Sequence, residues 1–205
     1  MPGLRIASAI SGLLLVLFLL VHLVGLAPAV ICRETFEHYA TTLHQQPWLP
    51  MLEISLAATA AVHLSFTVAK VYINRSAGNT ALLRSRRGRP LEALASRSKV
   101  AAGLCTLGFL ALHLQQLRWP RPTDGIELEV LQRLLQQPTT LVMYAAGSLA
   151  IGIHLLHGAE AAHRNLGLLT PANGTSIRWG SRLLSLGIGG GFLLISLRLA
   201  LGGLA

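Results

Sequence analysis

Residues 6–30 have the sequence IASAISGLLLVLFLLVHLVGLAPAV, an apolar run whose only ionisable side chain is His22. A helix of about 20 apolar residues is long enough to cross the hydrocarbon core of a bilayer. Four more runs of this kind occupy residues 49–74, 99–118, 139–163 and 179–202. Because a lone segment in lipid satisfies its backbone only as a helix, we expect an all-α bundle of five transmembrane helices, forming one domain over residues 1–205.

The composition excludes an ordinary soluble protein. Of 205 residues, 52% are hydrophobic and 12% are charged, whereas soluble domains carry roughly 25% charged residues. The two cysteines cannot build a disulfide framework, and Cys105, inside an apolar run, is expected to be a small packing residue. Residues 27–29 resemble a signal-peptidase site, but the run before them is long and contains His22, so we expect it to be a retained membrane helix.

The distribution of charge predicts the orientation. Of the 17 Lys and Arg residues, 12 would lie on one side of the membrane. They are Arg5, Lys70, Arg75, Arg84, Arg86, Arg87, Arg89, Arg97, Lys99, Arg164, Arg178 and Arg182. The positive-inside rule places this side, and with it the N-terminus, in the cytoplasm, and the C-terminus outside. The net charge of +9 therefore follows from topology and does not indicate nucleic-acid binding, and the Arg84–Arg89 cluster is chiefly a topology signal.

Two of the expected outer loops have helical periodicity. One pattern is Phe36, Tyr39, Ala40 and Leu43, and the other is Ile126, Val130, Leu131, Leu134 and Leu135. We expect two short amphipathic helices lying over the outer face. Trp48 and Trp119 are expected at the outer interface, and Pro50 suits the first turn of the second membrane helix.

Histidines are the main candidates for chemistry, because polar side chains deep in a bilayer are costly and usually functional. With a rise of about 1.5 Å per residue, His22 and His113 are expected in the outer half of the membrane, and His63 and His154 in the inner half. Two pairs at two depths, about 13 Å apart, are what two stacked haems with paired histidine ligands require. His157 is an alternative to His154, three residues away on a nearby face.

Other interpretations of these histidines were weighed. A single membrane histidine more often bonds a neighbouring helix, but four residues matched in depth favour two haem b groups. A transition-metal site fits less well, since its ligands would lie at one depth rather than two. His163 is expected at the interface, and His38 and His44 in solvent.

Several other residues are candidates for supporting roles. Lys99, Arg97, Arg164 and Arg75 are cations within reach of haem propionates at the inner face, although Arg75 is better explained by topology. Glu53 lies in an apolar run near the outer face, where it would accept protons from a quinol. It is equally explained as an acidic residue in the first turn of a helix, which the helix dipole stabilises. The glycines of the fifth run, Gly187, Gly189, Gly190 and Gly191, are expected to permit close helix packing.

The chain resembles the cytochrome b membrane-anchor subunit of succinate dehydrogenase and fumarate reductase, in its single-chain, five-helix, dihaem form. The residues that carry the resemblance are Phe18 to Gly25, Thr35 to Ala40 with Leu43 and Pro47, Leu52 to Ile54 with His63, Ser96 to Lys99, Phe109 to Leu114, His154 to Gly158, and Asn165 to Leu168. The resemblance implies that His22 and His113 hold the outer haem, and that His63 and His154 hold the inner haem. It favours His154 over His157, because the family's ligand stands four residues before a glycine.

The resemblance also implies partners and a function. A flavoprotein and an iron–sulfur subunit would dock on the cytoplasmic face, and this chain would pass electrons between them and a quinone, of the menaquinone type, in the cytoplasmic membrane. The chain departs from the family at Leu26, Thr67 and Gly152, and Gly152 puts in doubt a proton path that some members have. The alternatives are a haem b subunit of another redox complex, such as a hydrogenase or formate dehydrogenase, and a non-redox scaffold or transporter. A transporter often has broken helices, and no proline interrupts these helices centrally.

Overall fold

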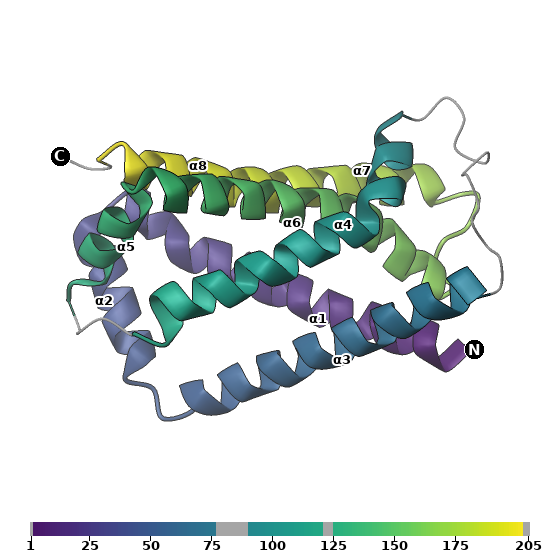
Figure 1. The fold of residues 1–205 in the computed structure, drawn as a ribbon, viewed down its shortest axis with the longest axis horizontal. Helices are drawn as coiled ribbons and strands as arrows, with labels where there is room; N and C mark the ends of the chain where they lie inside the picture. Colours follow the sequence, from purple (N-terminus) through teal and green to yellow (C-terminus); the bar gives the residue numbers. More distant parts are fainter. Residues whose placement is uncertain (1, 77–89, 121–124, 203–205) are drawn as a thin grey trace.

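The computed structural model describes residues 2–76, 90–120 and 125–202 (Figure 1). The Arg84–Arg89 cluster lies outside these ranges. Within them the chain is helical, and five helices are long and apolar enough to cross a membrane, as the sequence predicts. These spans are Gly3–Val30, Leu49–Ser76, Arg97–Arg118, Pro138–Asn165 and Gly174–Ala200.

Three of the spans contain a change of helix type. Helix α1 (Pro2–Leu26) ends in a 3-10 turn, η1 (Ala27–Val30), and α4 (Pro90–His113) continues as a π-helical turn, η3 (Leu114–Arg118). The fifth span consists of α7 (Gly174–Ser185), the π-helical turn η4 (Leu186–Gly190) and α8 (Gly191–Ala200). Helices α3 (Leu49–Ser76) and α6 (Pro138–Asn165) are uninterrupted. π-Helical turns are frequent at functional sites, and η3 begins directly after His113.

The two expected short helices are confirmed as α2 (Arg33–His44) and α5 (Glu127–Leu135). Both lie at the end of the bundle that carries the C-terminus, while the N-terminus lies at the opposite end (Figure 1). An odd number of spans requires this separation of the termini. The orientation relative to the cytoplasm stays a prediction; "outer" below means the end that carries α2 and α5.

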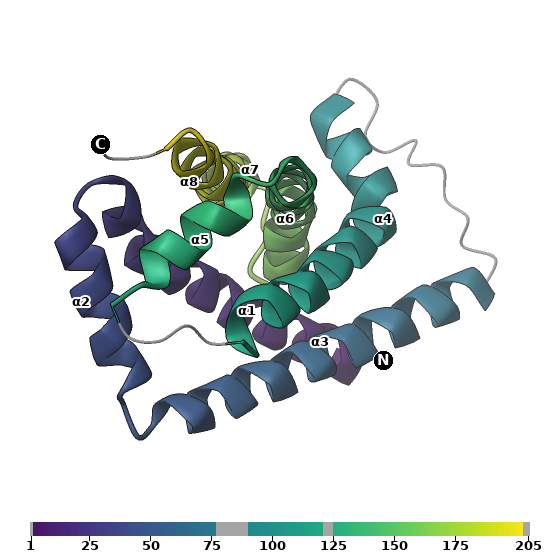
Figure 2. The same cartoon turned by 60° about the vertical axis from the view of Figure 1, so that its left-hand side comes forward.

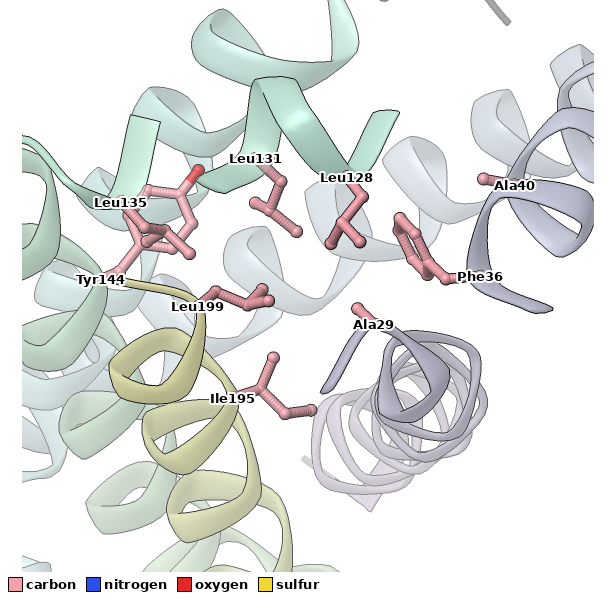
Figure 3. Packing of buried hydrophobic residues seen from close by; sticks show 9 residues of the cluster. All are labelled: Ala29, Phe36, Ala40, Leu128, Leu131, Leu135, Tyr144, Ile195 and Leu199. Atoms are coloured by element: carbon pink, nitrogen blue, oxygen red, sulfur yellow. The ribbon is translucent and has the colours of Figure 1, made fainter. Parts of the chain in front are cut away.

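A buried apolar cluster joins these two helices to the bundle (Figure 3). Its members are Ala29, Phe36, Ala40, Leu128, Leu131, Leu135, Tyr144, Ile195 and Leu199. The face of α5 that packs inward is therefore the one with Leu128, whereas Ile126, expected on that face, is 41% exposed. The reason is that Ile126 precedes the first turn of α5, so the helical pattern does not position its side chain.

The four helices that carry the candidate histidines pack unevenly. Helix α4 packs along α6, and α1 packs along both α3 and α6. Among the described residues, α3 makes no extensive contact with α4 or α6, and α1 makes none with α4. Figure 2 shows α3 on the side of α1 and α4 away from α8. Helix α3 is thus attached to the bundle mainly through α1.

Most of the apolar surface is exposed rather than packed. In the most apolar window of α3 no residue is buried, and large side chains such as Ile54 and Val68 are more than half exposed. Such a surface fits contact with lipid. Cys105 of α4 is also exposed, so the expectation that it is a packing residue was wrong.

Small residues allow two close helix contacts in the fifth span. A Cβ atom on Gly189 would lie 2.9 Å from the Cα of Gly152, so α6 and η4 approach backbone to backbone. The Ser185 hydroxyl donates to the Gly152 carbonyl oxygen at 2.6 Å in the same contact. Gly191 instead packs against the Leu23 side chain, whose nearest atom would lie 2.9 Å from a Cβ at this position. Gly187 and Gly190 have no neighbouring side chain or helix within 4 Å, so only half of the expected packing glycines act in this way.

Candidate functional site: two pairs of membrane histidines

The four candidate histidines lie in two pairs. The ring centroids of His22 and His113 are 6.0 Å apart with an angle of 79° between the ring planes. Those of His63 and His154 are 6.3 Å apart with an angle of 81°. These are the pairs expected from depth along the helices.

Each pair joins two helices that do not pack extensively against each other. The His22–His113 pair spans α1 and α4, and the His63–His154 pair spans α3 and α6. A histidine that only bonds a neighbouring helix is expected where two helices pack closely. The histidines of each pair therefore meet across helices that have little direct packing, as expected if a larger group separates the helices.

The ring of His63 is oriented by helix α1. Its Nδ1 atom lies 3.2 Å from the carbonyl oxygen of Ser8 and 3.3 Å from the Ser11 hydroxyl. A carbonyl oxygen can only accept, so Nδ1 carries the proton and Nε2 keeps a free lone pair, as in a metal-ligating imidazole. A Cβ atom on Gly12 would lie 3.0 Å from the His63 Cε1 atom, so the absence of a side chain there leaves room for the ring.

The partner ring of His154 has a similar neighbour. A Cβ atom on Gly103 of α4 would lie 3.4 Å from its Cε1 atom. Its Nδ1 atom is buried and interacts with the backbone of Lys99 without meeting ordinary hydrogen-bond geometry. Of the two candidates His154 and His157, it is the His154 ring that meets His63.

Aromatic side chains surround the outer pair. Phe18 stacks on His22 with centroids 5.4 Å apart, and Phe192 of α8 approaches the same ring at 5.8 Å. Phe109 lies 5.7 Å from His113, whose Nδ1 atom is 3.4 Å from the Tyr144 hydroxyl. The sequence analysis missed these supporting roles, although Phe18 and Phe109 each stand four residues before a histidine, where helix geometry brings side chains together.

The two pairs lie at different levels along the bundle. Gly12, beside His63, is ten residues before His22 on α1, and Gly103, beside His154, is ten residues before His113 on α4. Ten residues of helix correspond to about 15 Å. Both helices thus give the same separation, close to the spacing expected from sequence.

The donors of the site suit an iron held by two axial imidazoles. Two imidazole rings that bind one metal ion from opposite sides, each with a bond of about 2 Å, have their centroids about 6 Å apart. Both pairs have this separation. Among the described residues, no group of three or more His, Cys, Asp or Glu side chains is arranged to hold a metal ion. The histidines come in twos, which is the number of protein ligands that a haem iron takes when both axial positions are filled.

Glu53 has a partner that the sequence did not suggest. Arg118, the last residue of η3, binds the Glu53 carboxylate through two nitrogens, with Nε 2.6 Å from Oε1. Since η3 follows His113 directly, this ion pair ties the start of α3 to the turn beside the outer histidine pair.

The three expected propionate cations occupy different surroundings. Arg164 lines a cavity at the inner end of the bundle and pairs with Glu160 at 2.5 Å. Lys99 is exposed but close to His154, and Arg97 is exposed. Two cations missing from that set, Arg5 and Lys70, line the same cavity as Arg164.

His44 does not lie free in solvent as expected, whereas His38 is exposed. The His44 Nδ1 atom is 3.3 Å from the buried Glu127 carboxylate. Glu37 of α2 accepts hydrogen bonds from the first backbone amides of α5, those of Glu127 and Leu128, both at 3.1 Å. Burial and the hydrogen bond with Glu127 raise the pKa of Glu37. Burial acts against ionisation of Glu127, but bonds from Glu37 and the Gly125 amide, together with His44, outweigh it and lower the Glu127 pKa.

Comparison with protein-family models, with curated proteins and with solved structures gives no match for this chain. The candidate function therefore depends on the residues and the geometry described above.

Proposed function

We propose that this protein is a dihaem cytochrome b subunit that carries electrons across the membrane. The observation that supports this most directly is the two histidine pairs. Their ring centroids are 6.0 and 6.3 Å apart, on helices that do not otherwise pack extensively against each other. Haem iron supplies one-electron transfer, and two imidazole ligands leave no open position for oxygen.

The chain's own residues hold and orient the two groups. His22 and His113 would hold the outer haem within an aromatic shell that excludes water. His63 and His154 would hold the inner haem, with the Ser8 carbonyl keeping the Nδ1 proton of His63. Such second-sphere hydrogen bonds fix ring orientation and make the ligand more basic.

The outer end would carry the quinol chemistry. Glu53 lies near the outer interface, and its Arg118 partner belongs to the turn after His113. We infer that a quinol, of the menaquinone type, binds at this end. The Glu53 carboxylate would accept its protons one at a time and pass each to the outer side, and the one-electron acceptor would be the haem held by His22 and His113. Arg118 would hold the carboxylate in position between turnovers.

The resemblance noted in the sequence supports one complex above others. In the complex that we propose, this chain would anchor a flavoprotein and an iron–sulfur subunit at the cytoplasmic face of the cytoplasmic membrane. Together they would form a succinate dehydrogenase or fumarate reductase. The chain itself would not act on succinate. The basic character of the expected cytoplasmic side suits a docking surface, and nucleic acid is not a proposed partner.

The test is a pyridine haemochrome assay on the purified chain and on His22→Ala and His63→Ala variants. We expect two haem b groups per parent chain and one in each variant. His38→Ala is the matched control, since that side chain is exposed, and it should keep both haems. A folded parent without haem would refute the proposal and leave a non-redox scaffold or transporter. Co-purification with hydrogenase or formate dehydrogenase subunits would keep the cytochrome but refute the succinate complex.

A further inference from the structure

A cavity of about 300 Å³ lies at the inner end of the bundle. Three helices that are far apart in sequence form it: the start of α1, the end of α3 and the end of α6. Its polar lining is Arg5, Lys70, Asn74, Arg164 and Asn165.

The lining carries an excess of positive charge. Among the described residues no acidic side chain lines the cavity. One guanidinium nitrogen of Arg164 is engaged by Glu160 from outside the lining. Arg5 and Lys99 both lie close enough to repel the half-buried Lys70 ammonium. Like charges held together at a partly buried site repel one another more strongly than in water, so a bound anion would relieve the repulsion.

The cavity is connected to the inner histidine pair. The Lys70 ammonium donates to the Ser8 hydroxyl at 3.0 Å. The backbone carbonyl oxygen of Ser8 accepts from the His63 Nδ1 atom at 3.2 Å. Lys70 also follows His63 by two helical turns on one face of α3, a distance of about 10 Å.

We propose that this cavity binds an oxyanion, either carboxylate or phosphate, carried by a molecule in the membrane. The two asparagine amides supply neutral donors, and the cations supply charge-assisted hydrogen bonds. Two sources have this chemistry. One is the propionates of a haem held by His63 and His154, which rests on the proposed function. The other is the phosphate of an inner-leaflet phospholipid, since basic pockets between membrane helices bind such head groups, and this source is independent of haem.

The test variant is Lys70→Met, with Arg178→Met as the matched control. Arg178 is a cation expected on the same side of the membrane, but it does not line the cavity. Circular dichroism would establish that each variant is folded, and Lys70→Arg, which keeps the charge, should behave as the parent.

Native mass spectrometry with phosphatidylglycerol or phosphatidylcholine reads out the lipid source. If a lipid is bound, the parent retains phosphatidylglycerol in preference, and Lys70→Met weakens this binding about fivefold, because each cation near such a site contributes a factor of this size.

A redox titration reads out the haem source. Loss of a nearby cation disfavours the reduced haem, so Lys70→Met should lower the midpoint potential of the haem that disappears in His63→Ala. Lipid retention would then be unchanged.

The two readouts separate failure of this inference from failure of the proposed function. A chain without haem would refute the proposed function, while the lipid measurement would still test the cavity. If Lys70→Met and a Lys70→Met/Arg5→Met double variant match Arg178→Met in both readouts, no oxyanion binds in the cavity and the inference is wrong.

Discussion

Replacement of Gly12 by alanine tests how tightly His63 is positioned. The new Cβ would lie 3.0 Å from the His63 Cε1 atom and 3.4 Å from its Nδ1 atom. Carbon atoms in ordinary contact are about 3.5–4.0 Å apart, so the ring must move by a few tenths of an ångström. The hydrogen bond from Nδ1 to the Ser8 carbonyl is already 3.2 Å long. This is near the upper end of the usual range, so the displacement would weaken the hydrogen bond.

We expect Gly12→Ala to weaken binding of the inner haem by about 10–100-fold, the usual effect of losing a partner that orients a ligating histidine. Metal–ligand distances tolerate only about 0.2 Å, which is less than the required movement. The substitution should also stabilise helix α1 by about 1 kcal/mol, because alanine is a better helix former than glycine. Loss of haem would therefore not reflect a weaker helix.

The assay is haem content per chain, measured by pyridine haemochrome, together with the reduced-minus-oxidised spectrum. Gly180→Ala is the control, since a Cβ at that helical position meets nothing within 4 Å. Gly103→Ala should give a smaller loss, because its Cβ would lie 3.4 Å from His154, an ordinary contact. The reasoning is refuted if Gly12→Ala keeps both haems with parental affinity while His63→Ala loses one.

Three further perturbations address the structure outside the histidine pairs. Leu199 is fully buried in the outer cluster, so Leu199→Ala should cost about 2–5 kcal/mol in an unfolding titration; a cost below 1 kcal/mol would contradict its burial. The Arg118 and Glu53 side chains are 39% and 28% exposed, so a double-mutant cycle should give a coupling of about 1 kcal/mol or less, and a much larger value would contradict that exposure. At the α2–α5 contact, the lowered pKa of Glu127 stabilises the folded state at pH values above the ordinary glutamate pKa, and this contribution is lost as the pH falls. The raised pKa of Glu37 stabilises the folded state at pH values below the ordinary glutamate pKa, and this contribution is lost as the pH rises. Protection of the α5 amides should therefore be greatest between the two pKa values and decline toward neutral pH. Hydrogen exchange of the α5 amides, corrected for intrinsic rate, should show this decline in the parent and not in Glu37→Gln.

The membrane helices and the short outer helices could be predicted because their signals are local. An apolar run such as residues 6–30 satisfies its backbone only as a helix in lipid, whatever the rest of the chain does. The grouping of His22 with His113 was also predictable, because rise per residue converts sequence position into depth. The inner cavity was not: Arg5, Lys70 and Arg164 come from three helices, and only their packing brings the three cations together.

Two other contacts that sequence analysis did not predict also join residues that are far apart in the chain. The sequence determined that Glu53 lies near the outer interface, but only the tertiary structure decided that Arg118 binds it, because 65 residues separate the two. The sequence likewise left His44 in a polar loop helix, and the packing of α5 on α2 placed it against Glu127. Periodicity and hydropathy describe which faces of a helix are apolar, whereas the partner of each polar side chain depends on which helices meet and in what register.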